Sequence, residues 1–391
     1  MLKKVLITGG AGFIGSEIVR QLYNYGGWEV TVLDNLSTQI HGDNWKQSYL
    51  YSSIKDKCNF IKGSVCDLKK VCNAIGESEI IIHLAAETGT GQSMYLINQY
   101  NETNIMGTSN VFQAISNSNS QNHVKKIILS SSRAVYGEGQ YLCTRCGVVY
   151  PRGRSKQRML DGDFEMYCPN CGKIVQLIAT TEDSKVSPQS LYAYTKYAQE
   201  LMVRTMCPTM DIKYTILRFQ NVYGPGQSLK NPYTGILSVF SNLLLDNKTV
   251  NVFEDGRESR DFVNVKDIAT GVISCMKNEN SNGETINLGS GSNTSVYSIA
   301  SILKNNYKSQ SEIKITGDFR IGDIANNKAD ISKAESILGY KPSISLDDGL
   351  KEFCIWVRKQ KKGTLEFERS LNELEQAGMF IRKKETTNES N

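Results

Sequence analysis

A glycine-rich loop near the start of the chain limits the fold more than any other feature. Residues 5–8 (VLIT) form an apolar run typical of a buried strand, and residues 13–25 carry apolar side chains at helical spacing. Between them, Gly9, Gly12 and Gly15 allow a tight turn and a close approach of the backbone to a pyrophosphate at the helix N-terminus. The sequence therefore predicts a dinucleotide-binding strand, loop and helix.

The same alternation continues along the first 220 residues. Helical stretches separate most of the further apolar runs, which lie at residues 30–33, 60–61, 80–83, 126–130 and 214–218. Strands that alternate with helices form right-handed crossovers and a parallel sheet covered on both faces. We therefore expect a Rossmann-type doubly wound α/β domain.

After about residue 220 the pattern breaks into turn-rich pieces and short helices, which predicts a smaller substrate-binding domain over the carboxyl edge of the sheet. The predicted division is a nucleotide-binding domain at 1–139 and 181–220 with a returning segment at about 260–275, an insertion at 140–180, a substrate-binding domain at 221–355, and a C-terminal helix and tail at 356–391.

Asp34 indicates which dinucleotide binds. It ends the second predicted strand, nineteen residues after Gly15, where a carboxylate can accept hydrogen bonds from both ribose hydroxyls. A carboxylate there would repel a 2′-phosphate, and Asn35 supplies no compensating cation, so NAD is favoured over NADP. Asp67, after the third strand, could accept from the adenine amino group or could be an ordinary turn aspartate.

Tyr192 and Lys196 lie four residues apart near the start of a predicted helix, so both side chains share one face. A phenol with an ordinary pKa of about 10 is a poor base at neutral pH, but a neighbouring ammonium and a bound nicotinamide cation favour the phenolate. Ser132 ends the fifth strand and can offer a hydroxyl at the same edge of the sheet. The three residues predict a proton-transfer site.

These motifs resemble the extended short-chain dehydrogenases/reductases that act on nucleotide sugars. The resemblance runs from residue 5 to about residue 350. The matching pieces are residues 8–15 (TGGAGFIG), 83–86 (HLAA), 131–137 (SSRAVYG), Tyr192 with Lys196, 218–225 (RFQNVYGP), 260–263 (RDFV) and 320–323 (RIGD).

The resemblance implies a role for each matching residue. Ser132 would bind the sugar 4-hydroxyl, Tyr192 would be the catalytic base, and Lys196 would hold the nicotinamide ribose and lower the pKa of the tyrosine. The diphosphate of the substrate would be bound by Asn221, Arg260 and Arg320. The cofactor would be bound by Gly9, Gly12, Phe13, Ile14, Gly15, Asp34, Asn35, Asp67, Leu84, Ala85, Ala86, Asn104, Tyr192 and Lys196.

The residues after Ser132 favour epimerisation. Family members that are 4,6-dehydratases carry Asp and Glu there, whereas this chain has Arg133 and Ala134, which cannot serve as carboxyl acid or base. Reversible oxidation at C4 with NAD, through a 4-keto sugar, would invert that centre. Residues 91–95, 227–235 and the cysteine insertion resemble dTDP-L-rhamnose 4-epimerases, which form dTDP-6-deoxy-L-talose. The alternatives are a UDP-hexose or UDP-N-acetylhexosamine 4-epimerase, a 4-reductase and a 4,6-dehydratase.

Two Cys-x-x-Cys pairs, each followed by glycine, are separated by 21 residues, as in a zinc ribbon. Four thiolates leave no open coordination position, so the zinc would be structural. The alternatives are free thiols or two labile disulfides. The predicted ligands are Cys143, Cys146, Cys168 and Cys171.

A rival interpretation of another class is an NAD-sensing regulator whose zinc ribbon binds nucleic acid. A basic cluster in the insertion would favour it. The complete set of Ser132, Tyr192 and Lys196 would be superfluous for a sensor. The basic cluster consists of Arg152, Arg154, Lys156 and Arg158.

Composition bounds the partners and the compartment. The 391 residues include 45 Lys and Arg against 40 Asp and Glu, and the two signs are interspersed, which argues little for nucleic acid. No run approaches the ~18 apolar residues of a membrane span, and the first apolar run stops at Gly9, so we expect a cytoplasmic protein without a membrane partner. The family resemblance implies a homodimer formed by the helices near Asn104 and Tyr192.

Overall fold

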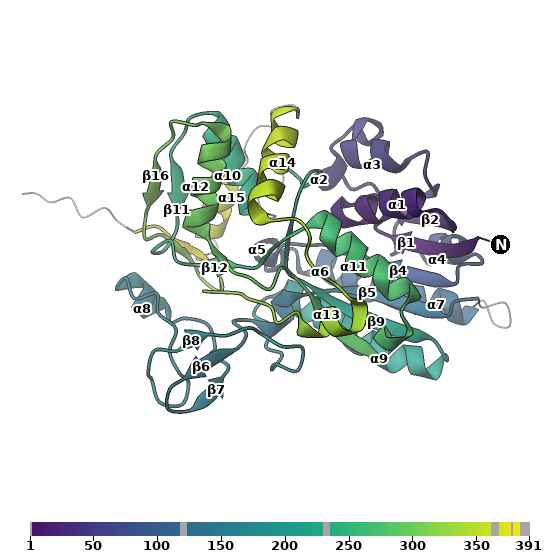
Figure 1. The fold of residues 1–391 in the computed structure, drawn as a ribbon, viewed down its shortest axis with the longest axis horizontal. Helices are drawn as coiled ribbons and strands as arrows, with labels where there is room; N and C mark the ends of the chain where they lie inside the picture. Colours follow the sequence, from purple (N-terminus) through teal and green to yellow (C-terminus); the bar gives the residue numbers. More distant parts are fainter. Residues whose placement is uncertain (1, 118–122, 230–234, 361–366, 377, 384–391) are drawn as a thin grey trace, which may run out of the picture.

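The computed structural model describes residues 2–117, 123–229, 235–360, 367–376 and 378–383. Its centre is a seven-stranded sheet with the order β14-β9-β5-β4-β1-β2-β3, and all neighbouring strands run parallel (Figure 1). The strands are β1 Lys3–Thr8, β2 Trp28–Asp34, β3 Asn59–Lys62, β4 Ile80–His83, β5 Lys126–Ser132, β9 Lys213–Phe219 and β14 Glu284–Leu288. This sheet confirms the predicted Rossmann-type α/β fold.

Helices cover both faces of the sheet. One face packs against α1 Phe13–Tyr25 and α11 Val265–Lys277, which lie side by side. The other face packs against α4 Leu68–Ile75, α7 Gly107–Asn117 and α9 Leu191–Thr209. Near-continuous burial along β1, β4 and β5 is what a parallel strand between two helical layers requires.

Strand β14 was not predicted from the sequence. Two of its five residues, Thr285 and Asn287, are polar and buried, which hides the apolar run. Tertiary contacts satisfy them: Arg204 donates to Thr285 Oγ1, and Asn287 Nδ2 donates to the Thr180 carbonyl. The chain thus returns to the sheet after the substrate-binding segments have begun.

A second apolar core lies beyond the carboxyl edge of the sheet and is built by α10 Ile236–Leu245, α12 Val296–Tyr307 and α14 Leu346–Arg358. Short strand pairs join its segments. They are β10 Asn221–Tyr223 with β13 Phe262–Asn264, β11 Val250–Val252 with β16 Ile313–Ile315, β12 Ser259–Arg260 with β15 Thr294–Ser295, and β17 Phe319–Arg320 with β18 Phe380–Ile381.

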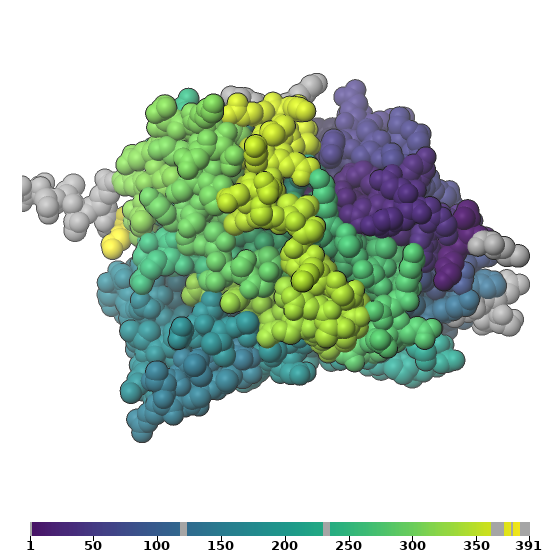
Figure 2. Space-filling model, in the orientation of Figure 1, coloured from purple at the N-terminus to yellow at the C-terminus, as the bar shows by residue number. Residues whose placement is uncertain are grey.

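The insertion forms a separate lobe at the lower left of Figures 1 and 2. Its antiparallel strands are β6 Tyr141–Cys143, β7 Gly147–Val149 and β8 Gln176–Leu177. The short helix α8 Lys156–Leu160 lies between β7 and β8 in the chain. The apolar core of the lobe includes Ala325, a residue of the substrate-binding half. The lobe is therefore packed against that half of the molecule.

No helix in the described residues is long and apolar enough to cross a membrane.

The elements not yet named are short. Within the predicted C-terminal segment the structure describes α15 Phe367–Gln376 and β18, while 361–366, 377 and 384–391 lie outside the described residues. The remaining elements are α2 Thr38–His41, η1 Trp45–Gln47, α3 Tyr49–Ile54, α5 Thr90–Ser93, α6 Ile97–Tyr100, η2 Asn101–Met106, η4 Arg133–Tyr136, η5 Glu279–Ser281 and α13 Ser332–Leu338.

Candidate active site

A cavity of about 610 Å³ lies at the carboxyl edge of the sheet, where open α/β sheets bind ligands. It reaches from the glycine loop after β1 to the second apolar core. Most of the residues that the sequence predicts for the site line this cavity. They are Gly9, Gly12, Phe13, Ile14, Gly15, Asp34, Asn35, Leu84, Ala85, Ala86, Ser132, Tyr192, Lys196, Asn221, Arg260 and Arg320.

The glycine loop fits the pyrophosphate of a dinucleotide. Gly12 donates to the Gly9 carbonyl at 3.1 Å, and Gly9 has a left-handed backbone with φ of 70°. A Cβ on Gly15 would press on the Gly9 oxygen and lie 2.6 Å from Gly10 Cα. No side chain caps the start of α1, which leaves its first amides free to bind an anion.

Asp34 ends β2 with its carboxylate buried beside the loop. Ala11 N donates to Oδ2 at 3.0 Å and Leu36 N to Oδ1 at 2.8 Å, and a carboxylate can accept further hydrogen bonds from ligand hydroxyls. Burial raises the pKa of this carboxyl, while the backbone hydrogen bonds and the charge of His41 act against the rise. Asp34 therefore lies where the sequence predicts a carboxylate that binds the ribose hydroxyls of the cofactor.

Tyr192 and Ser132 meet across the cavity. Ser132 is the last residue of β5, and Tyr192 is the second residue of α9, whose N-cap Ser190 accepts a hydrogen bond from Ala193 N. The Ser132 hydroxyl lies close enough to the Tyr192 phenol to favour its ionised form. A sugar hydroxyl placed between them would contact an acceptor and a donor at once.

Burial has the largest effect on the pKa values of Tyr192 and Lys196. It raises the pKa of the Tyr192 phenol, and the Ser132 hydrogen bond and the Arg133 charge oppose the rise. Burial lowers the pKa of Lys196 to about 7, with Glu200 opposing. Arg133 is thus a cation near Tyr192 to which the sequence analysis gave no electrostatic role. The lowering of the tyrosine pKa by Lys196, implied by the family resemblance, stays a prediction.

Two predicted cofactor residues do not line the cavity. Asp67 caps α4, because its carboxylate accepts from Lys69 N at 3.0 Å and from Lys70 N at 3.2 Å. This is the turn role that the sequence left open. Asn104 is fully buried in the π-helical segment η2, where its amide donates to Thr195 Oγ1 at 2.9 Å and accepts from Glu87 N at 2.7 Å. Asn104 therefore holds the loop after β4 against α9.

The far end of the cavity carries the predicted diphosphate ligands. Asn221 Oδ1 and Arg320 Nε are buried and have no hydrogen-bond partner within the described part of the chain. Buried polar atoms are normally paired, so such atoms in a cavity wall fit a polar ligand. The segment 227–235, part of the predicted substrate signature, also reaches the wall through Gln227, Ser228 and Gly235, whereas 230–234 lie outside the described residues.

Glu258 lines the same end of the cavity and was not predicted from the sequence. Burial, and then the charge of Glu254, raise its pKa well above the ordinary value. Its place two residues before the matching Arg260 was the available signal, but the motif did not mark it as a wall residue.

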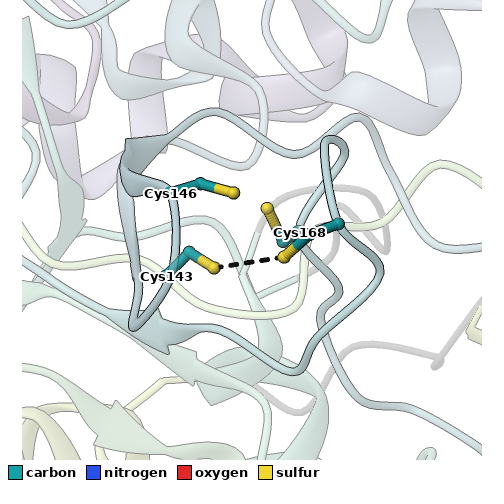
Figure 3. Close-up of side chains that lie close together, drawn as sticks. Cys143, Cys146 and Cys168 are labelled. Atoms are coloured by element: carbon teal, nitrogen blue, oxygen red, sulfur yellow. Dashed lines mark hydrogen bonds between the residues drawn. The ribbon is translucent and has the colours of Figure 1, made fainter.

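The four predicted metal ligands lie together in the insertion. Their Sγ atoms are all within 4.8 Å of one another, with Cys143 and Cys171 Sγ 3.5 Å apart. Figure 3 shows the labelled Cys143, Cys146 and Cys168 pointing toward one another. Tetrahedral zinc with Zn–S bonds of ~2.3 Å needs sulfurs about 3.8 Å apart, so this donor set fits the metal. All ten cysteines lie in described segments, and none forms a disulfide.

The predicted basic cluster of the insertion is smaller than the sequence suggests. Arg154 is 3% exposed and forms an ion pair with Glu254, because the loop carrying it folds against the substrate-binding half. Arg158 lies over the Tyr167 ring, 3.8 Å from its centroid. The cluster therefore loses one of its four charges to the interior of the molecule.

Comparison with known proteins identifies the class. The NAD dependent epimerase/dehydratase family matches residues 5–152 and 165–289, which is more than half of the chain. The chain belongs to this family, and the resemblance predicted from the motifs is confirmed.

Individual relatives are similar along nearly their whole length. The dTDP-L-rhamnose 4-epimerase of Burkholderia thailandensis is 36% identical over 362 residues, which are 92% of this chain and 96% of the relative. The putative UDP-glucose 4-epimerase of Methanocaldococcus jannaschii is 31% identical, with 92% and 99% covered. The solved structure of UDP-glucose 4-epimerase from Thermotoga maritima with UDP-glucose has a TM-score of 0.72 and 28% identity, and 91% of this chain and 99% of that chain are covered.

Proposed function

We propose that this protein is an NAD-dependent nucleotide-sugar 4-epimerase. The observation that carries the proposal is that Ser132, Tyr192 and Lys196 line one cavity together with the glycine loop and two arginines. The family match and the two relatives named as 4-epimerases support it.

The cofactor end would hold NAD through the glycine loop, Asp34 and Lys196. When bound there, NAD supplies a reversible hydride acceptor. Asp34 also supports the choice of NAD, because its buried carboxylate would face a 2′-phosphate with like charge.

The residues of this chain would handle the proton at the sugar 4-hydroxyl. Tyr192 Oη would accept it, and Ser132 would hold the sugar oxygen in line. Asn221, Arg260 and Arg320 would bind the diphosphate at the other end, so the sugar could present either face of C4 while its nucleotide stays fixed.

Arg133 and Ala134 support epimerisation over dehydration. They follow Ser132 at the start of η4, and neither has a carboxyl group to move protons at C5 and C6. The Arg133 guanidinium also donates to the Gly137 carbonyl, so this side chain is bound to the loop that follows it.

For the substrate we propose dTDP-L-rhamnose, converted reversibly to dTDP-6-deoxy-L-talose. The support is the 36% identical relative named dTDP-L-rhamnose 4-epimerase, together with residues 91–95 and the cysteine insertion. A UDP-hexose or a UDP-N-acetylhexosamine is the runner-up, because the same catalytic residues would serve it and the relative named for UDP-glucose is 31% identical.

A screen of dTDP- and UDP-sugars by NMR tests both levels of the proposal. Purified protein should invert C4 of dTDP-L-rhamnose without added reductant, and a nucleotide released by denaturation should be NAD. Inversion of a UDP-sugar alone would replace the substrate and keep the reaction. Absence of C4 inversion in every sugar that binds would overturn the function.

We also propose that the four clustered cysteines hold one structural zinc ion. The metal would fix the insertion and take no part in the chemistry, because four thiolates fill its coordination shell. Elemental analysis of reduced protein should find one zinc per chain, and Cys146→Ser should lose it. A content far below one zinc would contradict this site.

A homodimer remains a further proposal. Met106 is 54% exposed and Leu201 47% exposed on neighbouring helical surfaces near η2 and α9, as an apolar interface requires. Light scattering should give twice the chain mass, and a monomer at micromolar concentration would contradict the proposal.

A further inference from the structure

Arg154 ties the insertion to the wall of the cavity. It lies between β7 and α8, yet its side chain is buried. Its guanidinium binds Glu254 at two points, with Nη2 2.8 Å from Oε1 and Nη1 in contact with Oε2. Nη2 also donates to the Asp323 carbonyl at 3.1 Å. One side chain of the insertion therefore contacts two segments of the substrate-binding half.

Glu254, the partner of Arg154, has a strained backbone. Its φ is 51°, in the left-handed region that residues other than glycine rarely adopt, and its side chain is 1% exposed. Such a conformation persists only where the surrounding structure fixes it. Glu254 also lies close enough to Glu258, a residue of the cavity wall, for its charge to raise the pKa of that carboxyl.

The segment 320–325 is held from two sides. Arg260 donates to the Ile324 carbonyl at 2.9 Å and to the Ala325 carbonyl at 3.0 Å. From the other side, Glu138, just before the insertion, accepts from Ala325 N at 2.9 Å, and Ala325 packs in the apolar core of the lobe. The same segment carries Arg320 and Asp323 into the cavity wall.

We propose that Arg154 is a positioning residue for the substrate end of the cavity: with Glu254 it fixes segment 320–325 in the place where Arg320 can bind a nucleoside diphosphate. This inference rests on the proposed function for the class of ligand. Arg154 lies in residues 153–164, between the two segments that match the family, so the contact belongs to the insertion of this chain.

Arg154→Gln in the full-length, metal-loaded protein tests the inference. Calorimetry with dTDP and with UDP should show affinity weakened by about tenfold or more, because segment 320–325, which carries Arg320, loses the support of the Arg154 guanidinium. The KM for the nucleotide sugar should rise by a similar factor, while kcat and the NAD content stay near those of the parent. Arg152→Gln, an exposed neighbour, is the matched control and should bind as the parent does.

Two further variants separate positioning from general damage. Glu254→Gln should weaken dTDP binding in the same way, and the double variant should be no weaker than the poorer single one if the pair acts as a unit. Arg154→Lys keeps the charge and loses the two-point contact, so its affinity should be intermediate. It also serves as the test if Arg154→Gln does not fold.

Unchanged dTDP and UDP affinity in Arg154→Gln, or in Arg154→Lys where only that variant folds, would overturn the inference. A parallel loss of NAD content and kcat would overturn it too, because the effect would not be confined to the substrate end. Binding of dTDP or UDP by a parent protein that inverts no sugar would instead overturn the proposed function alone.

Discussion

The two ends of the cavity are built differently. At the nucleotide end the contacts span short stretches of chain: Gly12 donates to Gly9 three residues earlier, Leu36 donates to Asp34 two residues earlier, and Ala11 donates to Asp34 over 23 residues. At the substrate end, Arg154 reaches Glu254 over 100 residues and Glu138 reaches Ala325 over 187 residues. The difference shows that short motifs build the nucleotide end, whereas contacts between distant parts of the chain, one of them from the insertion, hold the substrate end together.

The largest effect should come from Tyr192, where a local motif carries the chemistry. Tyr192→Phe keeps the ring and its edge contact with Tyr100 but removes the hydroxyl that we propose as the proton acceptor. We expect kcat for epimerisation to fall by about 10²- to 10⁴-fold, the usual contribution of a general base. NMR turnover assays would measure it. Tyr194→Phe, an exposed position on the same helix, should keep parental activity, and equal losses in both variants would remove the special role of Tyr192.

Gly15→Ala probes the glycine loop without touching the substrate end. The added Cβ meets backbone atoms that cannot rotate away, so we expect a loss of about 1–3 kcal/mol in the free energy of unfolding and a lower content of copurified NAD. Thermal melts and nucleotide analysis would show both. Gly153→Ala, where a Cβ meets nothing within 4 Å, is the control. Full NAD content in Gly15→Ala would show that the loop tolerates a side chain and weaken the assignment.

The smallest effect concerns Glu258 at the substrate end, which faces Glu254, Arg260 and Asp323. Its pKa in the folded protein is raised above the ordinary 4.5, so the folded state holds this proton more tightly than the unfolded state. The resulting stability is fully present below pH 4.5 and is lost as the pH rises through the folded pKa. Relative to Glu258→Gln, the parent should lose at most about 1.4 kcal/mol per pH unit between pH 4.5 and the folded pKa, and nothing further above the folded pKa.

Chemical denaturation of both proteins across this pH range would measure the slope. Glu335→Gln replaces an exposed carboxylate and should track the parent. A parent that keeps a constant stability difference from Glu258→Gln from pH 4.5 to neutrality would show that the Glu258 carboxyl has no raised pKa in the folded protein.

The sequence predicts what neighbouring residues determine. Periodicity predicts six of the seven strands, and fixed spacing predicts the glycine loop, Asp34 and the Tyr192–Lys196 pair. The structure places the loop, Asp34, Tyr192 and Lys196 in the wall of one cavity at the edge of the sheet. The four cysteines of the insertion are likewise brought together as their spacing predicts.

The remaining features depend on tertiary contacts. Thr285 and Asn287 conceal strand β14 because their partners lie far along the chain. Asp67 and Asn104 are polar residues next to the site, and only the fold shows that one caps a helix and the other joins a loop to α9. The sequence places Arg154 in a basic cluster, because its partner Glu254 lies in another part of the chain.

The fate of the hydrogen at C4 tests the central claim most directly. The nucleotide sugar identified by the screen would be prepared with deuterium at C4, incubated with the protein in ordinary water, and its epimer analysed by NMR and mass spectrometry. We predict that the epimer retains deuterium at C4, because the atom removed from one face returns to the other without exchange. An epimer carrying solvent hydrogen at C4 would contradict the account.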